Sequence, residues 1–225
     1  MINKLLEEIP QFSLSLLPTP LYKLEQLSAM YKKNIYCLRD DITGFAFGGN
    51  KTRKLDFLLA EAKKSGFNTL IGVGANQSNF CRLTAAAGKT LGFEVYLLLS
   101  GQKPEKPTAN LLLDHLFGAV VHHTDAYENE QVEKESLELE KELAAKGKKV
   151  YRMPLGGSTP LGSLGYLKAF NEILDYSEAK KLVFEDIFLA SGSGGTQAGL
   201  VLGKMLTGWK GRIHGISGWS IPPGS

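Results

Sequence analysis

The sequence predicts an α/β fold with mostly parallel sheets, and three observations support this prediction. Segments with strand character alternate with segments of helical periodicity along most of the chain. Several strand candidates, such as 67–74 (FNTLIGVG) and 93–101 (FEVYLLLSG), are nearly continuous apolar runs, which is typical of strands buried on both faces. Glycine-bearing loops at 72–79 and 190–196 join strands to helices. Because ligands bind at the carboxyl ends of parallel strands, these two loops are the candidate sites.

The first part of the chain is expected to contain a short helix, an extended segment, a strand and a second helix. The short helix and the extended segment occupy the first 35 residues, where Pro10, Pro18 and Pro20 interrupt the sequence. The strand follows at 34–41 (NIYCLRDD). From residue 51 to residue 65 the apolar side chains recur at helical spacing, at Leu55, Leu58, Leu59 and Ala62.

The remaining elements alternate regularly. Ser78 or Asn79 is well suited to cap the helix that follows the strand at 67–74. The predicted helices lie at 77–92, 107–117, 127–146 and 162–179, and one more follows the glycine loop. The predicted strands lie at 93–101, 119–124, 149–157, immediately before the glycine loop, and at 212–217.

The composition indicates an ordinary globular protein with one large domain or two small ones. Of the 225 residues, 43% are hydrophobic and 22% are charged, and the formal net charge is +3. This charge is too small and too scattered to indicate a nucleic-acid or membrane partner. The charged run at 128–149 mixes both signs, which is typical of a solvated helix face.

The cysteine content and the N-terminus bear on the cellular compartment. Two cysteines, Cys37 and Cys81, suggest neither a disulfide framework nor a zinc site. The N-terminal sequence lacks the continuous apolar core of a signal peptide, and no apolar run approaches the length of a membrane span. We therefore expect a cytoplasmic location and no metal.

The loop at 191–196 (SGSGGT) is the clearer candidate site. Its glycines allow backbone N–H groups to converge on an anion, and the dipole of the following helix favours negative charge. Ser193 and Thr196 add hydroxyl donors. The loop does not match the dinucleotide fingerprint, because Gln197 stands where that motif requires glycine. We expect it to bind a phosphate group of another kind, with a simple glycine-rich turn as the alternative.

Lys51 follows Gly-Gly-Asn directly before a helix, and its residue type alone leaves three roles open. It could be a surface charge, a phosphate clamp or a nucleophile. A positive charge is unfavourable to the helix dipole at this position. Partial burial would lower the pKa of the amine and make it nucleophilic. A phosphate site together with a buried lysine is what pyridoxal 5′-phosphate requires.

Four stretches resemble, in order and spacing, the D-cysteine desulfhydrase and 1-aminocyclopropane-1-carboxylate (ACC) deaminase family. They are FGGNKTRKLDFLLAEA, GANQSNFCRLTAAAGKTLG, GGSTPLGSLGY and ASGSGGTQAGL, and the resemblance covers roughly residues 10–217. It implies a pyridoxal-phosphate enzyme of fold type II, the tryptophan synthase β-like fold, with two three-layer α/β domains. Residues 1–54 and 156–217 would form the large domain, and 55–155 the small inserted domain.

The resemblance also implies a role for each matching residue. Lys51 would bind the cofactor aldehyde covalently, Asn50 would flank it, and Lys54 would help to hold the phosphate. Asn79 would hydrogen-bond the pyridoxal 3′-oxygen. Ser78 would contact the substrate carboxylate and assist proton transfer. The phosphate cradle would consist of Gly192, Ser193, Gly194, Gly195 and Thr196.

The reaction implied by the resemblance is α,β-elimination on a small amino acid. The first expectation is conversion of D-cysteine to pyruvate, ammonia and sulfide, and ACC deaminase or cysteate sulfo-lyase activities are alternatives. The substrate would contact Ser78, Asn79 and Phe80. Phe80 stands where the family usually has His or Gln, which counts against ACC deaminase. Binding of a phosphate ligand without pyridoxal is a further alternative, and it would give Lys51 no role.

The end of the chain departs from the family pattern. Family members continue past the strand at 212–217, whereas 218–225 (GWSIPPGS) fits neither a helix nor the pattern. We therefore expect a truncated or frameshifted end, an atypical tail and an incomplete large domain. Its sheet would expose apolar faces and an unpaired edge.

The segment that this chain lacks would supply a tyrosine that approaches the substrate and a residue that meets the pyridine nitrogen. A catalytically inactive chain that still binds cofactor or a partner is therefore another alternative. The homodimer typical of the family is expected only if the fold is complete.

Overall fold

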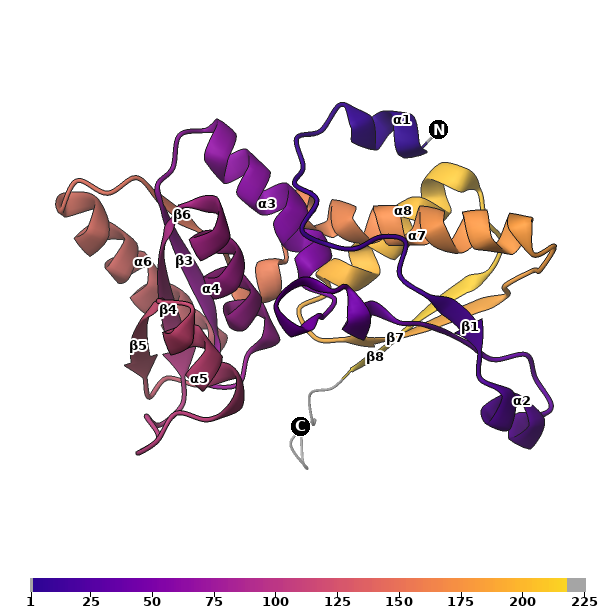
Figure 1. The fold of residues 1–225 in the computed structure, drawn as a ribbon, viewed down its shortest axis with the longest axis horizontal. Helices are drawn as coiled ribbons and strands as arrows, with labels where there is room; N and C mark the ends of the chain where they lie inside the picture. The colour runs from indigo at the N-terminus through magenta and orange to yellow at the C-terminus, as the bar shows by residue number, and fades with distance from the viewer. Residues whose placement is uncertain (1, 218–225) are drawn as a thin grey trace.

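The computed structural model describes residues 2–217, which form two groups of elements side by side along the longest axis of the molecule (Figure 1). One group is built on a four-stranded sheet. The other contains two short sheets and the longest helix. The expected atypical tail at 218–225 lies outside the described residues.

The helices and strands alternate as the sequence predicts over most of the chain. The helices are α1 (Ile2–Glu7), α2 (Glu25–Tyr31), α3 (Thr52–Lys64), α4 (Asn79–Leu91), α5 (Ala109–Leu116), α6 (Asn129–Ala145), α7 (Pro160–Ala179) and α8 (Gly195–Thr207). The strands are β1 (Leu21–Lys23), β2 (Tyr36–Leu38), β3 (Thr69–Ala75), β4 (Glu94–Ser100), β5 (Val120–Thr124), β6 (Val150–Arg152), β7 (Asp186–Ser191) and β8 (Arg212–Ser217). Three short 3-10 helices complete the described chain, η1 (Asp40–Ile42), η2 (Phe45–Phe47) and η3 (Leu155–Gly157).

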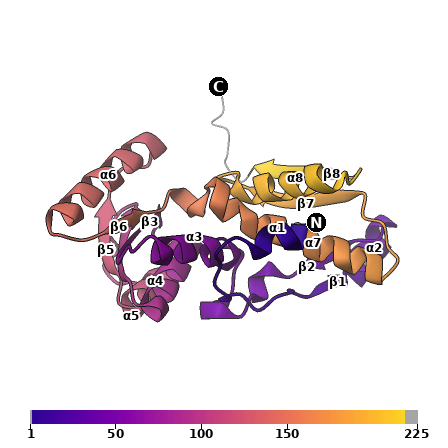
Figure 2. The same ribbon diagram turned by 90° about the horizontal axis from the view of Figure 1, so that it is seen from above.

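The four-stranded sheet is parallel and lies between two layers of helices. Its strand order is β5-β4-β3-β6. Leu70 of β3 packs in the core formed with α3, α4 and α5, whereas Ile71 and Val73 pack against α6 on the opposite face. Figure 2 shows α6 on one side of the sheet and α3, α4 and α5 on the other. This arrangement confirms the predicted α/β fold.

The second group is held together by α7 and α8. Phe170 of α7 and Leu200 of α8 pack with Ile187 of β7 and Ile213 of β8, which are neighbours in a parallel two-stranded sheet. The other face of these strands leaves Phe188 largely exposed. Exposed apolar side chains on this sheet agree with the expectation from the sequence.

Helix α3 connects the two groups because it contributes to both cores. Leu58 packs with the helices of the four-stranded sheet, and Phe57 packs with α7 and α8. The start of α3 lies directly against α7: a Cβ on Gly165 would be only 2.3 Å from the carbonyl oxygen of Arg53. The beginning of α3, where the candidate lysines lie, is therefore fixed by contact with α7.

A buried ion-pair network secures the same contact. The Arg53 guanidinium, whose side chain is 1% exposed, donates to Glu172 Oε1 at 2.8 Å and to Asp40 Oδ1 at 2.9 Å. It also donates to Thr19 Oγ1, and the hydroxyl of Tyr166 donates to Asp40 Oδ2 at 2.6 Å. The network joins the N-terminal segment, η1, α3 and α7.

Two expectations from the sequence are wrong. The strand expected at 149–157 ends at Arg152, because Pro154 lacks a backbone donor for a ladder and Gly156 has a left-handed backbone with φ of 64°. Helix α2 lies within the segment expected to be extended, between strands β1 and β2, which pair antiparallel. Pro10, Pro18 and Pro20 all precede this helix, and 25–31 contains no proline that would interrupt it.

Replacing Arg53 with methionine should destabilise the chain by about 3–5 kcal/mol, because Asp40 and Glu172, whose side chains are only 14% and 13% exposed, would remain without a cation. Urea denaturation measures the change. Arg212 offers a matched control, since its Nε and Nη2 donate to Asp186 but its side chain is 71% exposed. Arg212→Met should change stability little, and equal losses in the two variants would contradict this account.

Candidate active site

Lys51 lies at the N-cap of α3, directly after the turn formed by Gly48 and Gly49. Its side chain is half-buried, and Nζ donates to Asn50 Oδ1 at 3.2 Å. Within residues 2–217 no carboxylate forms an ion pair with it. Burial lowers the pKa of the Lys51 amine, so a larger fraction of it is uncharged and nucleophilic near neutral pH.

Three segments that are distant in sequence converge next to this lysine. Lys54 Nζ donates to the carbonyl of Gly156 at 3.2 Å and to Ser158 Oγ at 3.1 Å. Ser158 Oγ in turn lies 2.6 Å from Ser193 Oγ. A Cβ on Gly156 would lie 3.5 Å from Lys51 Cε and 3.0 Å from Ser193 Oγ, so the two lysines and the glycine loop line the same space.

The glycine loop ends in a helix N-terminus that opens toward this space. Strand β7 ends at Ser191, Gly192–Gly194 form an exposed turn, and α8 begins at Gly195 with Thr196 as its second residue. A Cβ on Gly195 would lie 2.8 Å from Lys54 Nζ and 2.6 Å from Ser158 Oγ. Glycine therefore lets the start of α8 approach Lys54 and Ser158 closely, which brings backbone N–H groups, hydroxyls and an ammonium group together as an anion site requires.

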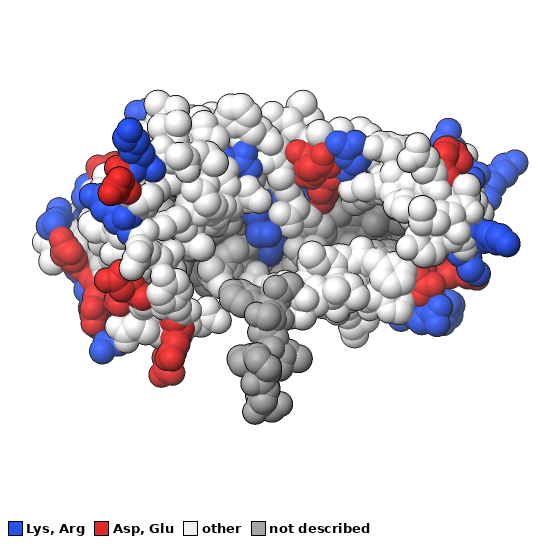
Figure 3. Space-filling view, turned by 90° about the horizontal axis from the view of Figure 1, so that it is seen from below, with Lys and Arg blue, Asp and Glu red and all other residues white. Residues whose placement is uncertain are grey.

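The site is electrostatically suited to an anion. Burial, together with the nearby charge of Lys51, lowers the pKa of Lys54 to about 8. The Lys54 side chain is 1% exposed, and its described partners are neutral oxygens. Figure 3 shows Lys or Arg side chains in a hollow near the middle of one face, while the acidic side chains visible there lie mostly toward its ends.

The first turn of α4 forms a second side of the site. Of the two N-cap candidates, Ser78 and Asn79, the structure has Ser78, whose Oγ accepts from Cys81 N at 3.2 Å. Asn79 Oδ1 accepts from Asn110 Nδ2 at 3.0 Å. Arg82, on the next turn, donates to the carbonyl of Gly48 at 2.8 Å and so attaches α4 to the turn before Lys51.

Phe80 lies in a different environment from Ser78 and Asn79. It is 2% exposed, belongs to the core beneath α4, and contacts the position of Gly157, where a Cβ would lie 2.8 Å from the ring. This placement gives no support to the predicted contact between Phe80 and the substrate. It indicates instead that the ring supports the glycine-containing turn of η3 from below.

Sequence reasoning missed four residues that the structure places at the site. Gly156 and Ser158 complete the cradle, and Arg82 and Asn110 hold Asn79. Ser158 had a detectable signal, because Ser-Thr-Pro in the GGSTPLGSLGY stretch is typical of a helix start. The contact of Asn110 with Asn79 has no signal in a single sequence.

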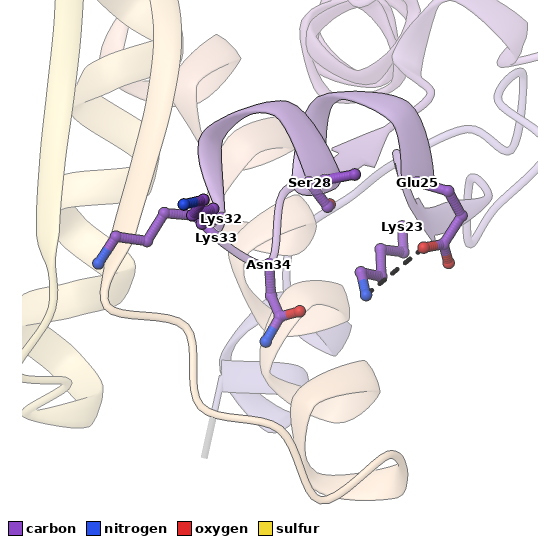
Figure 4. A pocket seen from close by; sticks show the side chains of 7 residues that line it. Lys23, Glu25, Ser28, Lys32, Lys33 and Asn34 are labelled. Carbon is purple, nitrogen blue, oxygen red and sulfur yellow. Dashed lines mark ion pairs between the residues drawn. The ribbon is translucent and has the colours of Figure 1, made fainter.

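A polar hollow of about 360 Å³ lies elsewhere, on α2 and its flanking residues. Figure 4 shows Lys23 paired with Glu25 there, while the side chains of Lys32 and Asn34 extend separately. None of the candidate site residues lines it. Among residues 2–217 there is also no group of three potential metal ligands and no helix long and apolar enough to cross a membrane.

Comparison with known proteins agrees with this geometry. Residues 12–223 match the family model described as pyridoxal-phosphate dependent enzyme, and the chain belongs to this family. A crystal structure of an ACC deaminase homologue superposes with a TM-score of 0.87 at 39% identity, covering 94% of this chain and 63% of that one. A threonine deaminase structure (TM-score 0.70, 19% identity, covering 88% of this chain and 59% of that one) shares the fold alone. Fold type II is thereby confirmed.

The curated relatives confirm the narrower resemblance. A putative ACC deaminase of Pyrococcus furiosus is 38% identical over 96% of this chain and 65% of its own. A bifunctional D-cysteine desulfhydrase/ACC deaminase of Arabidopsis thaliana is 41% identical, over 92% of this chain and 54% of its own. A D-cysteine desulfhydrase of Serratia proteamaculans is 39% identical, over 90% and 62%. The chain thus spans less than two thirds of the length of these relatives.

Binding of sulfate, an anion that does not titrate near neutral pH, should weaken as the pH rises through about 8, because the Lys54 ammonium group loses its proton. Calorimetric titrations between pH 6.5 and 9 measure this. Lys54→Met should bind sulfate weakly at every pH, whereas Lys64→Met, at an exposed position of the same helix, should behave as the parent chain does. A pH-independent affinity in the parent chain would contradict the assignment.

Proposed function

We propose that this chain binds pyridoxal 5′-phosphate through Lys51 and supplies the cofactor site of an enzyme that carries out α,β-elimination on a small amino acid. One observation carries the proposal. A half-buried lysine with a lowered pKa, which no carboxylate of residues 2–217 pairs with, lies next to an anion cradle built from α3, η3 and the start of α8. Membership of the pyridoxal-phosphate dependent family supports it.

The residues of the cradle fit a phosphate group. Lys54 and the hydroxyls of Ser158 and Ser193 can donate to its oxygens, and the first N–H groups of α8 are free of intrahelical partners. The space that a Cβ on Gly195 would fill is bordered by these donors. We assign the phosphate to Ser158 together with the predicted set, which consists of Lys54, Gly192, Ser193, Gly194, Gly195 and Thr196.

When bound, the cofactor supplies an aldehyde that reacts with amines and a ring that accepts electrons from the substrate. Lys51 would hold the cofactor through its uncharged amine, and Lys51 Nζ would be the base for the proton on the substrate Cα. Asn50 Oδ1 accepts from Nζ and orients the amine. Ser78, at the N-terminus of α4, can bind the substrate carboxylate and assist proton transfer.

D-cysteine is the substrate that we propose first, with sulfide as the leaving group. Relatives that are about equally similar are named D-cysteine desulfhydrase, ACC deaminase or both, so ACC is the second candidate. Cysteate is a third. Since Phe80 lies in the core, the residue at this position does not discriminate among them through direct contact.

We also propose the domain division at 1–54 with 156–217, and 55–155, because the four-stranded sheet has cores separate from that of α7 and α8. For the complete enzyme, we propose a homodimer in a reducing, cytoplasmic compartment. The free thiols of Cys37 and Cys81 fit such a compartment. Analytical ultracentrifugation of a longer protein that includes these 225 residues would test the dimer.

The 225-residue chain mixed with pyridoxal phosphate should develop a visible absorption band, and borohydride reduction should attach the cofactor to Lys51. Lys51→Ala and Lys51→Arg should lack the band, because neither side chain offers an amine that can react with the aldehyde. Lys64→Ala, on the same helix, should retain it. Peptide mapping by mass spectrometry identifies the labelled residue.

Label on a lysine other than Lys51, or no band at all, would rule out the cofactor assignment. A chain labelled at Lys51 that releases neither pyruvate nor sulfide from D-cysteine, nor ammonia from ACC, would support the alternative of an inactive chain that binds cofactor.

A further inference from the structure

The side-chain amide of Asn79 is held in one orientation by two donors. Asn110 Nδ2 donates to Asn79 Oδ1 at 3.0 Å, and Arg82 Nη2 donates to the same oxygen at 3.4 Å. Asn79 is exposed, and among residues 2–217 none accepts a hydrogen bond from its Nδ2. The oxygen of this amide is therefore occupied, and its two N–H donors remain available to a ligand.

The orientation follows from atoms whose roles cannot be exchanged. Asn110 Nδ2 also donates to the backbone carbonyl of Gln77 at 2.8 Å, and a carbonyl can only accept. The Asn110 atom in this position must be the nitrogen, so the Asn79 atom it contacts must be the oxygen. Arg82 gives the same answer independently, because a guanidinium has only donors.

Asn110 is itself fixed by the loop before α4. Its backbone N–H donates to Gln77 Oε1 at 2.9 Å, and Gln77 Nε2 donates to the carbonyl of Thr108 at 3.2 Å. These bonds join the start of α5 to the start of α4. The position of the Asn110 donor relative to Asn79 is therefore set by backbone groups on both sides.

Arg82 connects the same amide to the turn that precedes Lys51. Its guanidinium is buried and donates to the carbonyls of Ala46 at 2.7 Å and Gly48 at 2.8 Å. Ala46 and Phe47 have positive φ values of 44° and 70°, which cost free energy in residues other than glycine. The buried carboxylate of Asp114 lies near enough to interact electrostatically with Arg82.

The geometry points to Asn110 and Arg82 as positioning residues that hold the Asn79 amide as an N–H donor, so that the site selects the ionised form of the cofactor's 3′-oxygen. This inference rests on the proposed function. A donor stabilises an oxygen anion, whereas an amide turned by 180° would present its own oxygen and favour a protonated partner. Asn110 and Arg82 act through Asn79 and need not touch the cofactor.

The test follows the visible band of the pyridoxal-phosphate-loaded chain as a function of pH. Asn110→Ala should move the midpoint of its titration upward by about one pH unit and weaken cofactor binding about tenfold, because the ionised oxygen loses an oriented donor. Arg82→Lys, which keeps the charge opposite Asp114 but cannot reach all three acceptors, should shift the midpoint in the same direction. Asn34→Ala, at an exposed position between α2 and β2, is the control and should change neither quantity.

A double-mutant cycle separates positioning from general structural support. In an Asn79→Ala background, Asn110→Ala should produce no further shift, because the group it orients is absent. An equal shift in both backgrounds, or an unchanged midpoint in Asn110→Ala when Lys51 of the parent chain is labelled, would overturn this inference alone. Absence of Lys51 labelling in the parent chain would overturn it together with the proposed function.

Discussion

The ion pairs of Arg53 with Asp40 and Glu172 are the constraint on which the candidate site depends. Arg53 lies at the start of α3, between Lys51 and Lys54. Its ion pairs fix the rotation of this helix about its axis relative to α7. With Arg53 directed at α7, both lysines are directed at the cradle. The same network pairs Asp40 and Glu172 with Arg53, and among residues 2–217 neither lysine forms an ion pair with a carboxylate, so both remain available to an anion.

The cradle is unfavourable for the folded chain while no anion is bound. Burial lowers the pKa of both lysines, so between about pH 8 and the ordinary lysine pKa the unfolded chain binds more protons than the folded one. Stability from these groups therefore increases as the pH rises through that range. A bound dianion would raise the pKa of these lysines again, because it favours their ammonium forms. The energy lost in burying the two amines is recovered when a phosphate group is bound.

Much of this arrangement was predictable from the sequence, and the exceptions have physical reasons. The apolar strands, the cap at Ser78 and the glycine loop followed from local patterns, and local patterns govern these features. The contact of Lys54 with Gly156 joins residues 102 positions apart and depends on how α7 packs on α3, which no local pattern encodes. The segment from Pro154 to Gly157 continues an apolar run, which predicts a strand. Proline lacks a ladder donor and Gly156 has a left-handed backbone, and both end the strand.

The segment from Pro154 to Ser158 has two structural roles. It is the covalent crossing from β6, at the edge of one group of elements, to α7 in the other, and it also supplies the carbonyl of Gly156 and the hydroxyl of Ser158 to Lys54. A rotation of one group against the other would turn this segment and pull these oxygens away from the lysine. A phosphate held by Lys54 and Ser158 would oppose such a rotation, because the rotation would separate the groups that bind it.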